Sequence, residues 1–209
     1  MSLVAPTQSA NPSSATGASA PPIPDSELYR FTVNQYERMG ELGILTEDDR
    51  VELIDGYLVI KMGKNPPHVW SVDSIEQLFR VLLGAAWCVR RESPVRIPDM
   101  NEPEPDLVVA RGTRQTYRTR HPEPRDIGLI AEVSDTTYDR DRGKKWDANA
   151  KGGIPVYWIV NLTKRRVEVY TDPGPAGYAT RRDYHTGDVV PVIIDGRQLG
   201  QAAVDDILP

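Results

Sequence analysis

Apolar residues recur at the spacing of one helical face in two stretches, which predicts helices over Thr32–Gly43 and His68–Leu83. In the first stretch, Thr32 can cap the opening turn. In the second, the apolar positions are Val72, Ile75, Leu78, Phe79 and Leu82. A third helix is predicted over the polar segment Tyr138–Lys151, because Gly152–Gly153 follows it as a stop signal.

Short runs rich in β-branched and aromatic residues predict strands. Val51–Met62 is predicted to be a hairpin, since Asp55–Gly56 favours a tight turn. The other predicted strands are Trp87–Arg91, Pro94–Ile97, Asp106–Ala110, Gly128–Val133, Pro155–Asn161, Arg166–Thr171, Tyr178–Tyr184 and Val189–Ile194. Loops are expected at Gly63–Pro67 and Arg111–Asp126. The strand–helix–strand order over Gly128–Asn161 implies a parallel pair with a right-handed crossover, and the hairpin makes the sheet mixed. We therefore expect an α/β domain with a central mixed sheet flanked by helices.

The composition is that of an acidic protein with an uncharged start. The chain has 209 residues, of which 39% are hydrophobic, and this suffices for the core of one domain. The formal net charge of −5 argues against strong non-specific binding to nucleic acid, although it allows a local basic patch. Residues 1–24 carry no charged side chain, so we expect a disordered tail over residues 1–27 and a folded domain over 28–209.

The absence of several signals points to a cytoplasmic protein. Cys88 is the single cysteine, which excludes an internal disulfide and favours a reducing compartment. No apolar run is long enough to cross a bilayer, so no membrane partner is expected. The start of the chain lacks the basic region of a signal peptide. The three histidines are scattered and give no zinc-binding spacing.

Two carboxylates stand at the ends of buried-type strands. Asp106 precedes Leu107–Ala110, and Glu132 lies near the end of Gly128–Val133. Carboxylates that converge at strand ends commonly hold a hard cation such as Mg²⁺, and a nearby lysine can stabilise charge on a phosphate. Lys145, on the following predicted helix, is the candidate lysine. The ordinary alternative is that both acids simply face water.

The alternatives for the helix and the hairpin are also ordinary. Alternating charges along Asp139–Asp147 are typical of a solvated helix face, on which Asp141 and Lys145 would form an exposed pair. Glu52 lies in the first strand of the hairpin. It is either a solvent-facing residue or a third acid that tunes the metal or acts as a base.

The predicted loop after Asp106–Ala110 is strongly basic. Its part Arg111–Arg125 holds one acid, Glu123, and five arginines: Arg111, Arg114, Arg118, Arg120 and Arg125. A basic loop beside a carboxylate cluster fits a polyanionic substrate, and an ordinary solvated loop is the alternative.

The order of motifs resembles a known family. The motifs are Phe31–Thr32 with Tyr36, Glu52–Gly56, His68, Glu104–Val109, Glu132–Val133, Asp141–Lys145 and Gly153–Trp158. Together they resemble the Uma-two family of restriction-endonuclease-like proteins in the PD-(D/E)XK nuclease superfamily. The resemblance implies a restriction-endonuclease-like fold, with Asp106 and Glu132 as the paired carboxylates. The superfamily lysine usually stands two residues after the glutamate. Ser134 occupies that position here, and the resemblance assigns the role to Lys145.

The resemblance implies a metal-dependent endonuclease that cleaves DNA. Asp106, Glu132 and the Val133 carbonyl would hold Mg²⁺, with Mn²⁺ as an alternative, and Lys145 would offset charge in the transition state. Glu52 would lie nearby, and His68 would contact the phosphate or its water. A homodimer would suit the cutting of both strands. The competing hypothesis is a non-catalytic nucleic-acid-binding or accessory protein that keeps the nuclease fold.

Overall fold

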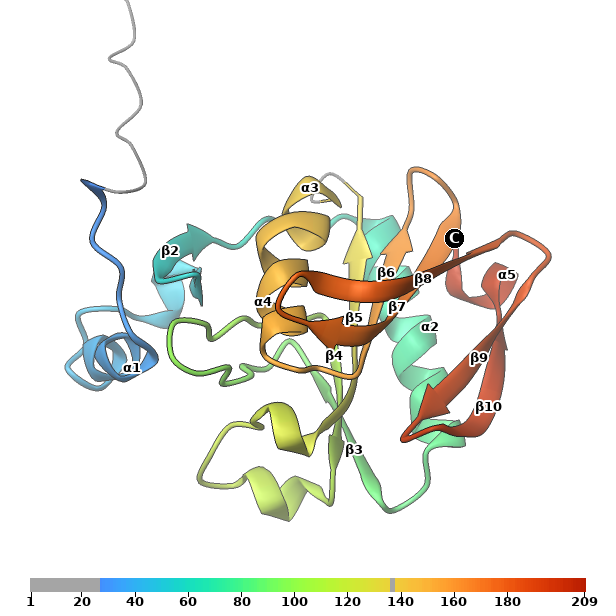
Figure 1. The fold of residues 1–209 in the computed structure, drawn as a ribbon, viewed down its shortest axis with the longest axis horizontal. Helices are drawn as coiled ribbons and strands as arrows, with labels where there is room; N and C mark the ends of the chain where they lie inside the picture. The colour runs from blue at the N-terminus through green and yellow to red at the C-terminus, as the bar shows by residue number, and fades with distance from the viewer. Residues whose placement is uncertain (1–26, 136–137) are drawn as a thin grey trace, which may run out of the picture.

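A six-stranded mixed sheet forms the centre of the molecule (Figure 1). The computed structural model describes residues 27–135 and 138–209, so most of the predicted disordered tail lies outside the described residues. The strand order is β3-β4-β5-β6-β7-β8. The strands are β3 (Trp87–Arg91), β4 (Leu107–Arg111), β5 (Ile127–Ser134), β6 (Val156–Asn161), β7 (Arg166–Gly174) and β8 (Gly177–His185). Among these six strands, only β5 and β6 pair in parallel, and such a pair needs a crossover connection between its strands.

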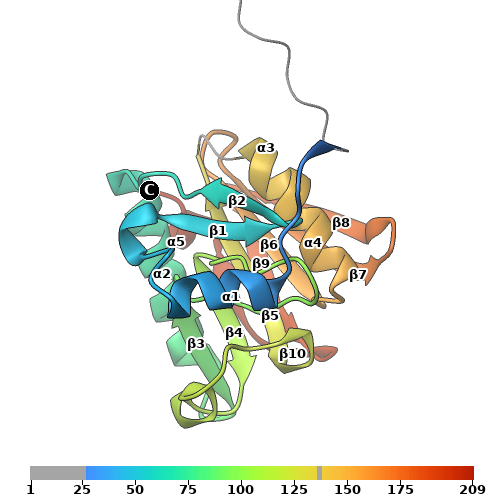
Figure 2. The same cartoon turned by 90° about the vertical axis from the view of Figure 1, so that its left-hand side faces the viewer.

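Different elements cover the two faces of this sheet (Figures 1 and 2). One face packs against α2 (Pro66–Leu82), the short helix α5 (Val204–Ile207) and the hairpin of β9 (Val189–Ile194) and β10 (Arg197–Ala203). The other face carries the crossover segment, which consists of α3 (Tyr138–Arg140), the π-helical turn η5 (Asp141–Lys145) and α4 (Trp146–Lys151). No helix in the described ranges is long and apolar enough to cross a membrane.

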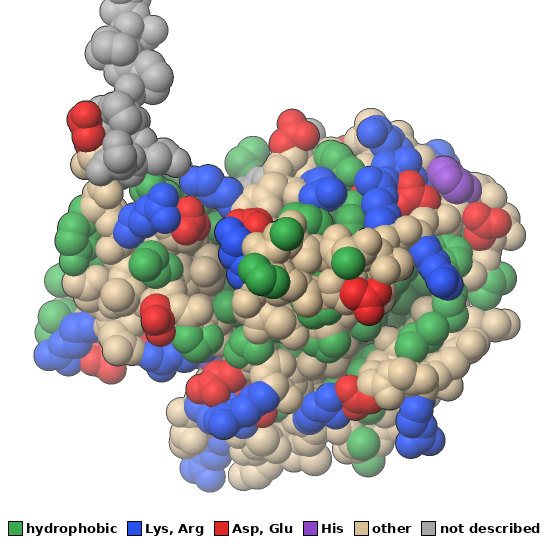
Figure 3. All heavy atoms as spheres, viewed as in Figure 1, with side chains coloured by type: hydrophobic (Ala, Val, Ile, Leu, Met, Phe, Trp, Pro, Cys, Tyr) green, Lys and Arg blue, Asp and Glu red, His purple; other side chains and the backbone are tan. Residues whose placement is uncertain are grey.

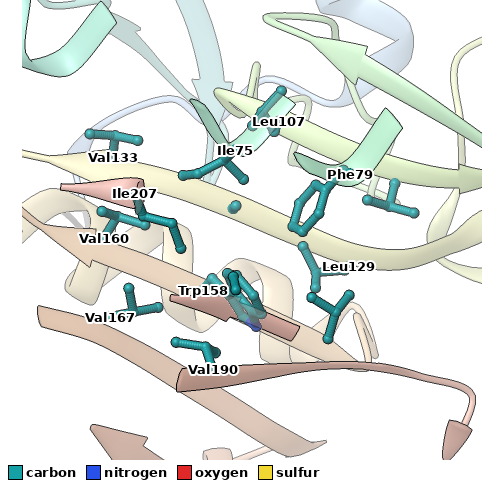
Figure 4. Packing of buried hydrophobic residues seen from close by; sticks show 14 of the residues in the cluster. Ile75, Phe79, Leu107, Leu129, Val133, Trp158, Val160, Val167, Val190 and Ile207 are labelled. Atoms are coloured by element: carbon teal, nitrogen blue, oxygen red, sulfur yellow. The ribbon is translucent and has the colours of Figure 1, made fainter. Parts of the chain in front are cut away.

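The larger core cluster lies between the sheet and α2. Leu129, Val133 and Trp158 project from alternate positions of β5 and β6 toward this helix (Figure 4). Phe79 of α2 meets Trp158 edge to face, with ring centroids 5.6 Å apart. The predicted apolar face of this helix is therefore the face that the sheet buries.

Capping residues explain where the first two helices begin. The Thr32 side chain caps α1 (Val33–Glu41), and Gln35 completes a reciprocal capping box. The Asn65 side chain accepts from the His68 amide, 3.1 Å away, so α2 begins at Pro66 rather than at His68. Prolines suit the first helical turn because its amides have no intrahelical acceptor. The predicted loop Gly63–Pro67 is accordingly too long.

Tertiary pairing corrects several strand predictions. The predicted hairpin forms as β1 (Val51–Ile54) and β2 (Tyr57–Ile60), but it is a separate two-stranded sheet. The central sheet is mixed without this hairpin, because its β5–β6 pair is parallel and its other four pairs are antiparallel. Pro94–Ile97 is not a strand and makes only an isolated bridge between Ile97 and Asn101 in the described structure.

Three further segments differ from their predicted form. The loop Arg111–Asp126 contains two 3-10 turns, η3 (Arg114–Tyr117) and η4 (Pro124–Asp126). The predicted helix Tyr138–Lys151 is interrupted at Gly143, whose backbone is not helical. Strand β10 and helix α5 were not predicted, because their few apolar residues show no clear period on their own.

Truncation of the core aromatic on α2 tests this packing. We expect Phe79→Ala to lower the free energy of unfolding by about 3–5 kcal/mol, because it leaves a cavity against Trp158. The matched control Val81→Ala lies two residues away and is exposed, so its effect should stay within about 0.5 kcal/mol. Urea unfolding of both variants measures the difference, and equal effects would contradict the assigned packing face.

Candidate active site

Asp106 and Glu132 lie side by side in the central sheet, where the inner strand β4 begins and its neighbour β5 approaches its end. Leu107 pairs with Ala131 in the antiparallel β4–β5 ladder. Asp106, which precedes Leu107, therefore lies opposite Glu132, which follows Ala131. The Asp106 amide donates to Glu132 Oε2 at 3.3 Å, and the Val133 amide donates to Asp106 Oδ2 at 2.8 Å. The backbone of each strand thus holds the carboxylate of the other.

Lys145 lies buried against Glu132. Its Nζ is 3.1 Å from Glu132 Oε1 and 3.3 Å from Glu52 Oε2. The three residues are only 5%, 3% and 1% exposed, respectively. Burial alone would lower the pKa of Lys145, but the charges of Glu132 and Glu52 outweigh burial and raise this pKa above its usual range. Lys145 therefore remains protonated and serves as a fixed positive charge.

The interrupted crossover segment aims Lys145 inward. Asp141 is buried on the same flank, where its Oδ2 accepts from Ser134 Oγ at 2.7 Å. The Tyr157 hydroxyl donates to the Asp141 carbonyl at 3.0 Å. Lys144 instead lies 4.5 Å from the centre of the Tyr57 ring. Asp141 and Lys145 are thus buried, which corrects the interpretation of this segment as a solvated face with an exposed ion pair.

Glu52 and His68 complete the group. Glu52 faces inward from β1 and accepts from the Glu104 amide at 3.0 Å, so it is not the solvent-facing residue of the ordinary alternative. His68 Nε2 lies 3.2 Å from Asp106 Oδ2. Burial alone would raise the pKa of Asp106, but His68 and the Val133 amide lower it. All five candidate catalytic residues therefore lie in one group.

The group borders a cleft of about 1070 Å³. Among the described residues that line it, eleven are Asp or Glu and four are Lys or Arg. Burial raises the pKa of Glu132 well above its usual value, and Asp106, Asp141 and Glu52 add to this rise while Lys145 opposes it. The lining therefore holds more carboxyl groups than basic side chains, and the buried Glu132 among them resists ionisation without a nearby positive charge.

A family model described as "Uma2: Putative restriction endonuclease" matches residues 33–201. The chain belongs to the Uma2 family. The structure is similar to the crystal structure of "a putative nuclease belonging to DUF820" from Anabaena variabilis, with a TM-score of 0.62 and 15% sequence identity. That similarity covers 85% of this chain and 97% of the other, and it supports the predicted restriction-endonuclease-like fold. No curated protein matches this chain.

The donor set of this Uma2 chain suits a hard cation. The restriction-endonuclease-like family generally uses divalent metal ions. Two adjacent carboxylates in an over-acidic site are oxygen ligands of the type that Mg²⁺ and Mn²⁺ prefer. Within the described ranges, no group of three or more His, Cys, Asp or Glu side chains could hold a metal ion. Asp106 and Glu132 would therefore need backbone or water oxygens to complete a coordination shell.

The arginines of the basic loop lie outside the cleft that these carboxylates border. Arg111 ends β4 and Asp106 precedes it, so about 16 Å of extended strand separates them. Arg111 pairs with Asp195 and Arg120 with Asp126, both at 2.5 Å. The described lining of the cleft includes none of Arg111, Arg114, Arg118 and Arg120. The loop leaves β4 at the end opposite Asp106 and reaches the cleft at His121, so it is its arginines that lie outside the described lining.

Sequence reasoning missed three acids around the site. Asp141 is four residues before Lys145, a spacing that places both on one helical flank. Glu102 and Glu104 precede Asp106 at intervals of two, as in an extended chain with one shared side. These spacings were the available signals. The three acids line one cleft only because the β1–β2 hairpin packs against the segment that carries Glu102 and Glu104.

Glu102 provides a pH-dependent probe of this wall. It is 5% exposed, and its Oε2 has no hydrogen-bond partner among the described residues. Burial, followed by the charge of Glu37, raises the pKa of Glu102 from 4.5 to about 7. Since the folded pKa is raised, the stabilisation is present below pH 4.5 and is lost as the pH rises to about 7.

We expect wild-type protein to lose about 3 kcal/mol of unfolding free energy relative to Glu102→Gln between these pH values, with no further loss above them. Urea unfolding at closely spaced pH values measures this difference. Glu47→Gln, at an exposed glutamate of the same cleft, is the control and should leave the difference from wild type nearly constant. A pH-independent difference for Glu102→Gln would contradict the assignment.

Proposed function

We propose that this Uma2 protein is a divalent-metal-dependent endonuclease that hydrolyses phosphodiester bonds of DNA. The observation that carries this proposal is the buried contact of Lys145 with Glu132, next to Asp106 and open to a cleft. Burying a lysine among carboxylates is costly, and apolar packing would stabilise the fold equally well. Such a group is expected where charge has a chemical use.

Asp106 and Glu132 would hold the metal ion, with the Val133 carbonyl as a backbone ligand. A bound Mg²⁺ or Mn²⁺ polarises a phosphate and lowers the pKa of a bound water. His68 Nε2 and the Val133 amide both contact Oδ2 of the Asp106 carboxylate, which leaves Oδ1 for a ligand in the cleft. Because carboxyl groups outnumber basic side chains in the cleft lining, the site favours the binding of a cation.

The remaining residues have separate roles in this proposal. Lys145 offsets the charge that develops on the phosphate, since its raised pKa keeps it protonated and excludes it as a general base. Glu52 contacts Lys145 and the Glu104 amide, so it positions the lysine. His68 orients the Asp106 carboxylate through its Nε2 contact and would reach the water network around the phosphate.

The acidic cleft favours a second hypothesis. Eleven carboxylates against four basic side chains repel a polyanion unless cations intervene. A non-catalytic accessory protein that keeps the nuclease fold would not bring a polyanion into the cleft, so it could carry this acidic lining without a bound cation. We expect the enzyme, because an accessory protein has no need for the combined set of Asp106, Glu132 and Lys145. A homodimer would suit cleavage of both strands of a duplex.

Neighbouring lysines give a matched test of catalysis. We expect Lys145→Ala to slow cleavage of duplex DNA by about 10²–10³-fold, because a preorganised charge at the phosphate is lost. Lys144→Ala should cleave at the parental rate, since Lys144 is exposed and contacts the Tyr57 ring. The measurement is a single-turnover assay with Mg²⁺ or Mn²⁺. Equal rates for the two variants would remove Lys145 from catalysis, and absence of cleavage by the parent would favour the accessory protein.

Metal binding can be measured without activity. We expect calorimetry to detect Mn²⁺ binding to the parent protein and Asp106→Asn to weaken it by roughly tenfold or more, because a carboxylate ligand is lost. Asp135→Asn is the control, since Asp135 lines the same cleft but contacts Asn65. Equal weakening by both substitutions would indicate diffuse attraction of ions to an acidic surface rather than a site.

A further inference from the structure

The crossover segment has a second flank that faces away from the cleft. Asp141 and Lys145 face the carboxylate group, whereas Tyr138, Arg142 and Trp146 face β7 and β8. The Tyr138 hydroxyl reaches Glu168 at 3.1 Å, and Trp146 meets the Tyr170 ring at 6.0 Å. Both sets follow the four-residue spacing of a helical flank. One segment therefore carries the candidate lysine on one side and a basic, aromatic surface on the other.

Part of this surface is a neutralised network. Glu168 is fully buried and lies 2.7 Å from Arg166 and 3.3 Å from Arg181. Asp183 lies 3.1 Å and 2.6 Å from the same two arginines. Two carboxylates thus compensate two guanidinium groups, and this network fastens the crossover segment to the sheet.

Arg142 and Lys164 are the surplus charges. Within the described ranges neither makes an ion pair, and each lies on an aromatic ring. Arg142 Cζ is 4.1 Å from the centre of the Trp146 ring, and Lys164 Nζ is 5.4 Å from that of Tyr138. Stacking orders a guanidinium while its N–H edges remain available to an anion.

This surface adjoins the rim of the cleft. The turn between β6 and β7 carries Lys164, and its Leu162 amide donates to the Ser134 carbonyl at 2.9 Å. Thr163 Oγ1 contacts the Asp135 carbonyl at 3.4 Å, and Asp135 lines the cleft. In the space-filling view, Lys and Arg side chains gather in the upper right, where β6, β7 and β8 lie (Figure 3).

We propose that the surface around Arg142 and Lys164 binds the phosphate backbone of the nucleic-acid substrate outside the cleft. This inference rests on the proposed nuclease function and names the region that holds its substrate. The crossover helix separates the surface from Lys145, and a helix with side chains is about 10–12 Å across. One strand of a duplex carries a phosphate about every 3.4 Å along the helix axis. The phosphates that this surface contacts would therefore lie about three nucleotides from the scissile phosphate.

The charge distribution gives the physical reason for such a surface. The cleft is lined by an excess of carboxylates, so attraction for a polyanion has to come from elsewhere. The arginines of the loop after β4 do not line the cleft. The Arg142–Lys164 surface combines uncompensated cations with proximity to the cleft rim.

The test is the double variant Arg142→Gln/Lys164→Gln, which spares the buried Glu168 network. Fluorescence anisotropy with a labelled random-sequence duplex, with Ca²⁺ replacing Mg²⁺, measures affinity over a salt series. We expect weaker binding and a salt slope lower by about 1.8, since two phosphate contacts are lost. In cleavage assays KM should rise while kcat stays near the parental value, because neither residue touches the reacting phosphate.

The matched control is Arg114→Gln/Arg118→Gln, which removes two exposed arginines that do not line the cleft. It should leave affinity and slope unchanged, and unchanged melting temperatures would show that both double variants are folded. If the parent binds and cleaves DNA and the Arg142/Lys164 variant behaves like it, the proposed surface is wrong and the nuclease function stands. If the parent neither binds nor cleaves DNA, or binds only an acidic peptide such as polyglutamate, both proposals are overturned.

Discussion

The contact between Lys145 and its two glutamates is the constraint on which the arrangement of the site depends. Glu52 comes from the N-terminal hairpin, Glu132 from a central strand and Lys145 from the crossover segment. A buried charge that loses its partner is strongly destabilising, commonly by about 3–5 kcal/mol. The three elements must therefore keep their relative positions so that each of these charges keeps its partner. The hairpin lies outside the central sheet, and this charge contact helps to fix its position.

The parallel pairing of β5 and β6 makes this contact possible. A parallel pair needs a crossover, and here the crossover covers the sheet face from which Glu132 projects. The interruption at Gly143 lets one short segment serve two flanks. Lys145 turns toward the cleft, while Tyr138 reaches the buried Glu168 on the other side. The network around Glu168 and the candidate site are therefore both held by contacts with this one segment.

The electrostatics of the cleft differ from those expected of a protein that binds a polyanion. Carboxylates predominate in its lining, and most basic side chains at its rim are paired, as Lys61 is with Glu104 and Lys64 with Glu92. Cations held by the carboxylates and basic residues outside the cleft are the two physical means by which such a site can accept a phosphate backbone. The proposed metal at Asp106 and the proposed surface around Arg142 are complementary parts of one explanation.

The sequence by itself determined the local elements and pointed to the candidate site residues. The apolar spacing around Phe79, the Asp55–Gly56 turn and the Thr32 cap depend on neighbours in the chain, so short-range pattern sufficed for them. Asp106, Glu132 and Lys145 were identified by order and resemblance. Tertiary structure alone decided that Glu52 is buried, that Asp141 joins the site, and that the hairpin stays outside the sheet. It also decided that the arginine loop leaves the far end of β4, away from Asp106. These outcomes depend on pairing and packing between distant segments, and no local periodicity encodes which end of a strand meets which partner.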